Sequence, residues 1–160
     1  MGGRDPRPVG RARTLLAAVE EAGAGAFVAD TAPIIYRLER AASRRLVEAV
    51  DPLFDAVEQG MLGCIVSAIS VAELLIRPFR AGPAAVAVVD AFLRQPLVGV
   101  VEVGHSTART AAAVLARRRL HRLPDALIVA TATELEIPVV TGDRRLAQRA
   151  PSAFLVADFA

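Results

Sequence analysis

The feature that constrains the fold most is the stretch from Leu123 to Arg145, LPDALIVATATELEIPVVTGDRR, in which a helix and a strand follow each other. Residues 125–136 are apolar within, with several small alanines, and polar at the end, which indicates a helix lying close against a sheet. Pro138 closes this helix, and Val139–Val140 forms a short buried strand after it. A carboxylate opens the helix and another follows the strand. Because functional sites form at the carboxyl edge of an open parallel sheet, these acids are candidates for a site.

Strands alternate with helices along the whole chain. Short apolar strands are expected at residues 26–29, 64–66, 98–103, 139–140 and 154–156. Helices are expected at residues 11–22, 33–38, 42–59, 67–78, 83–94, 106–119, 125–136 and 144–149. We expect Pro52 to kink or split one of these helices, Pro78 to end another, and Ser67 to cap that same helix at its amino end. The alternation predicts an α/β protein with three layers, α/β/α, around a central, mostly parallel sheet.

A single domain accounts for the 160 residues, which are enough to bury a sizeable core. Residues 1–25 are expected to form a tail and an extra helix, and residues 26–160 the domain itself. The single cysteine cannot form an internal disulfide, and no apolar run approaches the roughly 20 residues that a membrane span needs. We therefore expect a cytoplasmic protein without a membrane segment.

The basic residues exclude several classes of α/β protein. All 19 are arginine, and the chain contains no lysine. A Walker-type phosphate loop, a response-regulator receiver site and a haloacid-dehalogenase phosphatase each depend on a lysine, so these three classes are excluded. No Gly-rich GxGxxG run follows a strand, which leaves a dinucleotide site without support.

Four carboxylates stand out by their positions. Asp30 follows the first expected strand, Glu73 lies one helical turn past the second, Asp125 opens a helix, and Asp143 follows the fourth strand. With right-handed crossovers, three of them come from the carboxyl edge of the sheet. Like charges in one cleft repel each other, and a divalent cation relieves that repulsion. Oxygen ligands select hard ions such as Mg²⁺ or Mn²⁺, and such a site hydrolyses phosphodiesters by orienting and activating water.

Each acid also has a purely structural interpretation. Asp30, Asp125 and Asp143 are placed where an aspartate could simply cap a helix, and taken singly the two interpretations are equally good. Glu73 separates them, because it lies inside a helix among apolar residues where no cap is needed. Its structural alternative is an exposed ion pair with Arg77, which would contribute only about 0.3–0.5 kcal/mol.

Four short motifs carry a resemblance to a known family. They are DTAPIIY at residues 30–36, SAISVAE at 67–73, PDA at 124–126 and TGD at 141–143. In this order they resemble the four acidic motifs of the PIN-domain ribonucleases, and the similarity spans roughly residues 27–156. In size and plan the chain is similar to the VapC toxins of VapBC toxin–antitoxin pairs, which are metal-dependent endoribonucleases. One such motif is weak evidence, whereas four in order are specific.

The resemblance implies a PIN-like fold in which Asp30, Glu73, Asp125 and Asp143 are both catalytic and metal-binding, with Mg²⁺ or Mn²⁺ as the cofactor. It also implies an RNA substrate, a homodimer, and a VapB-like antitoxin whose extended segment packs over the acidic cleft with an arginine or lysine among the acids. The helices at 33–38 and 42–59 are candidates for a groove that receives this segment; alternatively, their apolar residues complete the core of the monomer.

Hydroxyl and arginine side chains near the acids are further candidates. Three hydroxyls are candidates to add to the metal shell or hold its waters, although ordinary turn chemistry explains each one singly; they belong to Thr31, Ser70 and Thr141. Setting the four acids apart leaves 13 of the 17 acidic residues against 19 arginines. Arginines flank two of the acids and are expected to bind an RNA backbone, unless they only form a solvated helix face; they are Arg117, Arg118, Arg119, Arg122, Arg144 and Arg145.

The leading hypothesis from the sequence is a Mg²⁺-dependent endoribonuclease that acts as the toxin of a type II toxin–antitoxin pair. One alternative is a non-catalytic PIN-fold binding module, which the loss of an acid would support; all four acids are present. Another is a metal-dependent nuclease or phosphohydrolase that acts on DNA. Such enzymes usually carry more acids and DNA-binding insertions than 160 residues leave room for.

Overall fold

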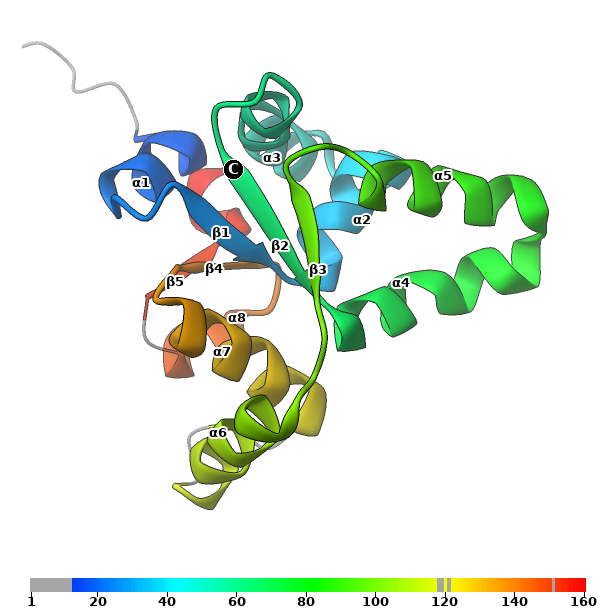
Figure 1. Ribbon diagram of the computed structural model, residues 1–160. Helices are drawn as coiled ribbons and strands as arrows, with labels where there is room; N and C mark the ends of the chain where they lie inside the picture. The colour runs from blue at the N-terminus through cyan, green and yellow to red at the C-terminus, as the bar shows by residue number, and fades with distance from the viewer. Residues whose placement is uncertain (1–12, 118–119, 121, 151) are drawn as a thin grey trace, which may run out of the picture.

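Five parallel strands form the central sheet in the computed structural model, which describes residues 13–117, 120, 122–150 and 152–160 (Figure 1). Their spatial order is β3-β2-β1-β4-β5, and every neighbouring pair is parallel. The strands are β1 (Ala26–Ala29), β2 (Gly63–Ser67), β3 (Val98–Val101), β4 (Val139–Thr141) and β5 (Ala153–Leu155). The first strand is therefore central, and the chain runs outward from it on both sides. This is the switch point at which parallel sheets open a crevice.

Helices cover both faces of the sheet, which confirms the predicted three-layer α/β/α architecture. The helices are α1 (Leu15–Glu21), α2 (Thr31–Glu39), α3 (Arg44–Glu58), α4 (Ala68–Ala81), α5 (Pro83–Leu93), α6 (His105–Ala116), α7 (Leu123–Leu135), α8 (Arg144–Arg149) and the short 3₁₀ helix η1 (Val156–Phe159). Side chains of α1 to α5 and η1 share one core with Phe27 and Ala29 of β1. Side chains of α7 and α8, with α6 beside them, pack with Val28 on the other face. Successive residues of β1 thus point to opposite layers, as the pleat of a strand requires.

The larger core is centred on three aromatic rings. Phe27 of β1 packs edge-on against Phe54 of α3 with ring centroids 6.0 Å apart, and Phe54 packs in the same way against Phe92 of α5 at 5.8 Å. The apolar stripe of α3, to which the ring of Phe54 belongs, is buried; it consists of Val47, Val50, Leu53, Phe54 and Val57. This stripe completes the core of the monomer. The apolar face of the helix predicted at 42–59 is therefore not available as a groove for an antitoxin segment, and that interpretation was wrong.

Pro52 does not split its helix, although its predicted kink stays a prediction, and the predicted helix end at Pro78 was wrong. Pro52 lies within α3, which runs unbroken from Arg44 to Glu58, and Pro78 lies within α4, which continues to Ala81. A proline removes one helical hydrogen bond, but tertiary packing on either side of it can hold the helix together. The end of α4 is set instead by Gly82, whose φ of +121° lies outside the range that L-residues readily adopt.

The extra amino-terminal helix is present as α1. Its first turn is capped by Thr14, whose Oγ1 accepts a hydrogen bond from the backbone N–H of Ala17 at 3.2 Å. Leu15 and Val19 are buried in the same core as Phe27, against α3. The division of the chain at residue 25 stays a prediction. Within the described residues, no helix combines the length and the apolar character that a membrane crossing needs.

Candidate active site

The four predicted acids gather at the carboxyl edge of the sheet. Asp30 directly follows β1, Asp143 follows β4 by two residues, Glu73 lies in the second turn of α4, and Asp125 lies in the first turn of α7. The four carboxylates are close enough for the negative charges of Glu73 and Asp143 to act on Asp30, and for those of the other three to act on Asp125. Four segments separated along the chain therefore place their acids in one negatively charged cluster.

Asp30 is the most enclosed of the four. Only 9% of its surface is exposed, and both its carboxylate oxygens accept hydrogen bonds. Oδ1 accepts from the backbone N–H of Thr31 at 2.7 Å, and Oδ2 accepts from the hydroxyl of Thr141 at 2.6 Å. Burial is the largest influence and raises the pKa of Asp30; the two hydrogen bonds lower this pKa in part, and the charges of Glu73 and Asp143 raise it further.

Threonine hydroxyls connect the acids to one another. Thr31 Oγ1 donates to Glu73 Oε2 at 2.8 Å, which links the start of α2 to α4. Thr141 Oγ1 donates to Asp30 and also accepts a hydrogen bond from the backbone N–H of Asp143 at 2.9 Å. Two of the three hydroxyls predicted beside the site thus contact its acids directly.

The serines of the second motif behave differently. Ser67 occupies the amino-cap position of α4, as predicted, but its side chain makes no capping hydrogen bond. The hydroxyls of Ser67 and Ser70 are both fully buried, and neither has a hydrogen-bond partner within the described part of the chain. A buried hydroxyl left without a partner costs about 1–3 kcal/mol. The structure therefore assigns no contact with the acids to Ser70, and its place in the metal shell stays a prediction.

Capping and site formation occur together in two of the aspartates. Asp30 caps α2 as described, and Asp143 Oδ1 caps α8 by accepting from the backbone N–H groups of Arg145 at 2.7 Å and Leu146 at 3.4 Å. Asp125, in contrast, lies inside the first turn of α7, whose amino-cap position is taken by Arg122. Its pKa is raised first by burial and then by the other three acids, while the charge of Arg122 lowers it. The two interpretations of these aspartates are therefore compatible, because one carboxylate can serve both purposes.

The structural alternative for Glu73 does not hold. The guanidinium of Arg77 pairs with Glu39 of α2 at 3.3 Å instead. Glu73 makes its hydrogen bond with Thr31, toward the acidic cluster. Glu73, for which the sequence offered no capping role, is thus turned toward the other acids.

The chemistry of these donors fits a hard divalent cation, because all are oxygens and the repulsion among them is relieved by positive charge. Across the described ranges, however, no group of three His, Cys, Asp or Glu side chains is arranged to hold a metal ion as it stands. Asp30 and Glu73 are turned toward threonine hydroxyls, although each carboxylate retains further acceptor capacity. Shared ligation of one ion therefore requires side chains to turn from these positions.

Four of the six arginines predicted to bind RNA lie within the described residues. Arg117 and Arg122 are exposed at the adjoining ends of α6 and α7, and the charge of Arg122 acts on Asp125. Arg144 and Arg145 are exposed in the first turn of α8, where the Arg144 guanidinium is 4.0 Å from the carboxylate of Asp158. Two further arginines of the prediction lie outside the described residues; they are Arg118 and Arg119.

Sequence reasoning missed a tight contact between α2 and the turn that follows β4. A Cβ added to Gly142 would lie 2.7 Å from the Cβ of Ala32 and 2.7 Å from the hydroxyl oxygen of Tyr36. Ala32 and Tyr36 are four residues apart on α2 and so share one face of it. The available signal was the glycine between Thr141 and Asp143, which marks a place where another segment approaches the backbone closely.

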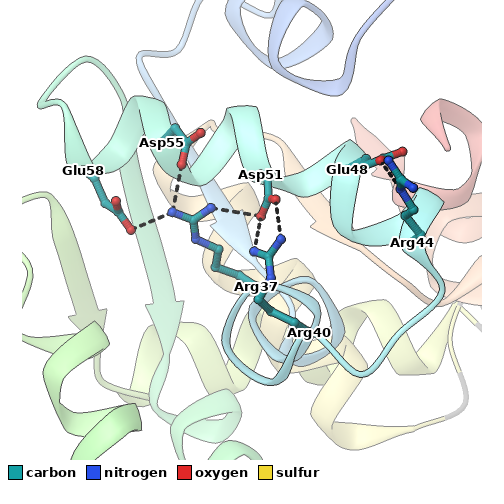
Figure 2. Close-up of polar contacts among 7 residues, drawn as sticks. All are labelled: Arg37, Arg40, Arg44, Glu48, Asp51, Asp55 and Glu58. Carbon is teal, nitrogen blue, oxygen red and sulfur yellow. Dashed lines mark hydrogen bonds and ion pairs between the residues drawn. The ribbon is translucent and has the colours of Figure 1, made fainter.

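The other face of α2 is held by charge (Figure 2). Arg37, whose side chain is only 17% exposed, donates to Asp51 Oδ1 at 2.9 Å, to Asp55 Oδ1 at 2.8 Å and to Glu58 Oε1 at 2.9 Å. Arg40 adds two contacts with Asp51. The signal in the sequence was the spacing of these three acids, which puts them along one side of α3. Their ion pairs with Arg37 hold α2, the helix capped by Asp30, against α3.

Comparisons with known proteins agree with this architecture. The sequence model of the PIN-domain family matches residues 27–151. VapBC2 from Rickettsia felis, solved with a DNA fragment from their promoter, has a TM-score of 0.64 at 14% identity, over 81% of this chain and 96% of that one. A toxin–antitoxin complex from Klebsiella pneumoniae has a TM-score of 0.61 at 18% identity, over 81% of this chain and 97% of that one. FitAcB from Neisseria gonorrhoeae has a TM-score of 0.61 at 23% identity, over 82% of this chain and 98% of that one. No curated protein matches the sequence significantly. At these identities the solved structures establish the shared fold.

Proposed function

The chain belongs to the PIN-domain family, and from this membership we propose that it is a metal-dependent endoribonuclease and the toxin of a type II toxin–antitoxin pair. The observation that carries the proposal is the convergence of Asp30, Glu73, Asp125 and Asp143 on one edge of the sheet, where each of two aspartates experiences the charge of other acids. A monomer gains no stability from such repulsion. The clustering of the acids is instead explained by the binding of a cation and of a polyanionic substrate.

The residues of the site divide the work between them. The four acids would hold Mg²⁺ or Mn²⁺, which supplies an activated water and neutralises charge on the phosphate that is attacked. The hydroxyls of Thr31 and Thr141 hold the carboxylates of Glu73 and Asp30 in position through single hydrogen bonds. Exposed arginines on α6, α7 and α8 would bind the RNA backbone beside the acids through bidentate contacts with phosphate.

An antitoxin is the proposed partner, because one solved structure with this fold is a toxin–antitoxin complex from Klebsiella pneumoniae and another is VapBC2 from Rickettsia felis. Within the chain, an apolar groove of about 230 Å³ runs between α2, α4 and α5, and it suits an extended apolar segment. Its lining includes Ile35, Leu38, Leu74, Pro78 and Val88. Because Leu74 is the neighbour of Glu73, a basic side chain on that segment would reach the acids and compete with metal. We also propose that the toxin is a homodimer that acts on RNA in the cytoplasm; light scattering on the purified chain tests its oligomeric state.

Purified protein with matched RNA and single-stranded DNA of the same sequence tests the enzymatic proposal. We expect the RNA to be cut in Mg²⁺ or Mn²⁺ and to stay intact in EDTA, while the DNA stays intact throughout. Cleavage of DNA but not RNA would support the DNA nuclease, and RNA binding without cleavage of either strand would support the non-catalytic module. Co-purification with the product of a neighbouring small gene should suppress the activity; full activity in that complex would contradict the proposed blocking of the cleft.

A further inference from the structure

Tyr36, the single tyrosine of the chain, lies with its hydroxyl end against the turn that carries Asp143. A Cβ at Gly142 would come within 2.7 Å of the phenol oxygen and 3.3 Å of the ring carbon that bears it. The absence of a side chain at Gly142 is thus what allows the phenol to reach this position. The ring itself is partly buried against the larger core, so its orientation is held from behind.

The hydroxyl of Tyr36 is a hydrogen-bond donor without an acceptor among the residues that the structure describes. Burial and, after it, the negative charge of Asp30 raise the pKa of this phenol, so it keeps its proton at neutral pH. Within the described residues, no group accepts a hydrogen bond from it, although the acids of the site lie nearby. Three backbone N–H groups of the site are already engaged: those of Thr31, Asp143 and Arg145 donate to side chains of the cluster.

A phosphodiester brought to four carboxylates needs donors for its non-bridging oxygens, and the acids supply none. We propose that the hydroxyl of Tyr36 donates a hydrogen bond to a non-bridging oxygen of the RNA phosphate held at Asp30 and Asp143. This inference rests on the proposed function and adds a substrate-binding residue to it. Tyr36 contacts the substrate from α2. Because Gly142 has no side chain, it leaves room for the hydroxyl of Tyr36 beside the turn.

The variant Tyr36→Phe tests the inference because it removes one oxygen and keeps the ring. A hydrogen bond to a charged oxygen predicts a loss of roughly ten- to a hundredfold in kcat/KM for RNA cleavage. The same reasoning predicts weaker binding of a short fluorescent RNA in Ca²⁺, under conditions without cleavage, and a nearly unchanged melting temperature. Thr133→Val is the matched control. It also removes a hydroxyl, one that bonds to the carbonyl of Val129, but at the opposite end of α7 from Asp125, and it should keep the wild-type kinetics.

The outcomes separate this inference from the proposed function. If the wild type cleaves RNA and Tyr36→Phe has the same kcat/KM and affinity, the hydroxyl only packs and the inference is overturned. If the wild type does not cleave RNA, the proposed function fails, and the binding assay decides alone: weaker binding by the variant supports the inference, and equal or absent binding overturns it. Should the variant not fold, the wild type labelled with ¹³C-tyrosine gives ring signals of Tyr36 only. A shift of the hydroxyl-bearing carbon on saturation with RNA supports the inference, and an unchanged signal overturns it.

Discussion

Opposing influences act on the carboxylate of Asp30. Two hydrogen bonds favour its charged form, while burial and the neighbouring acids disfavour that form more strongly, so its pKa is raised. A group with a raised pKa in the folded state contributes stability when protonated. That stability is fully present below the ordinary aspartate pKa of about 3.9 and is lost as the pH rises through the raised value. The metal-free protein is therefore destabilised by this charge at neutral pH.

Asp30→Asn should consequently raise the melting temperature at pH 7 in EDTA. Asparagine caps helices as well as aspartate does, and it lacks the charge that Glu73 and Asp143 repel. The difference between variant and wild type should shrink toward zero as the pH falls to about 4, where the wild-type carboxyl is itself protonated. Thermal unfolding followed by circular dichroism from pH 4 to 8 measures this difference. A variant that is less stable by the same amount at every pH would show that the hydrogen bonds of the carboxylate outweigh its charge.

Gly142→Ala should destabilise the protein by about 1–3 kcal/mol, because its methyl group would overlap Ala32 and the hydroxyl of Tyr36. Ala32 offers no flexible side chain that could give way, so α2 or the turn must shift. Gly104→Ala is the matched control, since a Cβ there meets nothing within 4 Å and its loss should stay below about 1 kcal/mol. Urea unfolding of both variants measures the difference; equal losses would mean that the close approach at Gly142 is easily relieved.

At the scale of elements, α2 is the part of the molecule on which the site depends. Its amino end carries Asp30 and Thr31, one face contacts Gly142, and Arg37 on its last turn is bound by acids of α3. Asp51 and Asp55 stand on either side of Pro52, and both bind the same guanidinium. This arrangement gives a physical reason why the proline does not split α3: the flanking turns are joined through Arg37.

Arg37→Ala should lower the free energy of unfolding by about 2 kcal/mol, because three carboxylates would then face one another without their shared cation. Arg44→Ala is the matched control, because Arg44 is 90% exposed and, among the described residues, pairs only with Glu48, one turn away on α3 (Figure 2). Its removal should leave the unfolding curve nearly unchanged. Equal effects of the two substitutions in urea would contradict the role given to Arg37. RNA cleavage by Arg37→Ala should also fall, since α2 positions Asp30.

At the scale of the whole molecule, local patterns predicted most of the fold. The limits of the strand at 26–29 and of the helix at 144–149 agree with the structure to the residue, because apolar runs and helix-start residues signal them locally. The expected split at Pro52 and the expected helix end at Pro78 did not occur, because contacts from distant segments override a local helix breaker. No local pattern carries such contacts.

The residues of the candidate site could be predicted from local patterns, but the contacts between them could not. The three aspartates could be predicted because each follows a strand or opens a helix, and Glu73 because it lies inside a helix where no cap is needed. The bonds between Thr31 and Glu73 and between Thr141 and Asp30, in contrast, join residues 42 and 111 positions apart. The geometry of the cluster therefore depends on the tertiary fold. The same holds for Tyr36, whose nearness to Gly142 follows only once α2 lies beside the end of β4.

The acidic cluster is proposed to cut RNA. The most direct test is the rate at which purified Asp30→Asn cleaves RNA in Mg²⁺, compared with wild type and with Asp90→Asn. Asp90 is a matched acid on α5, far from the cluster in sequence and paired with Arg94 at 3.6 Å. We predict that Asp30→Asn is folded and slower by at least about a hundredfold, while Asp90→Asn keeps the wild-type rate. A folded Asp30→Asn protein that cleaves RNA at the wild-type rate would contradict the claim.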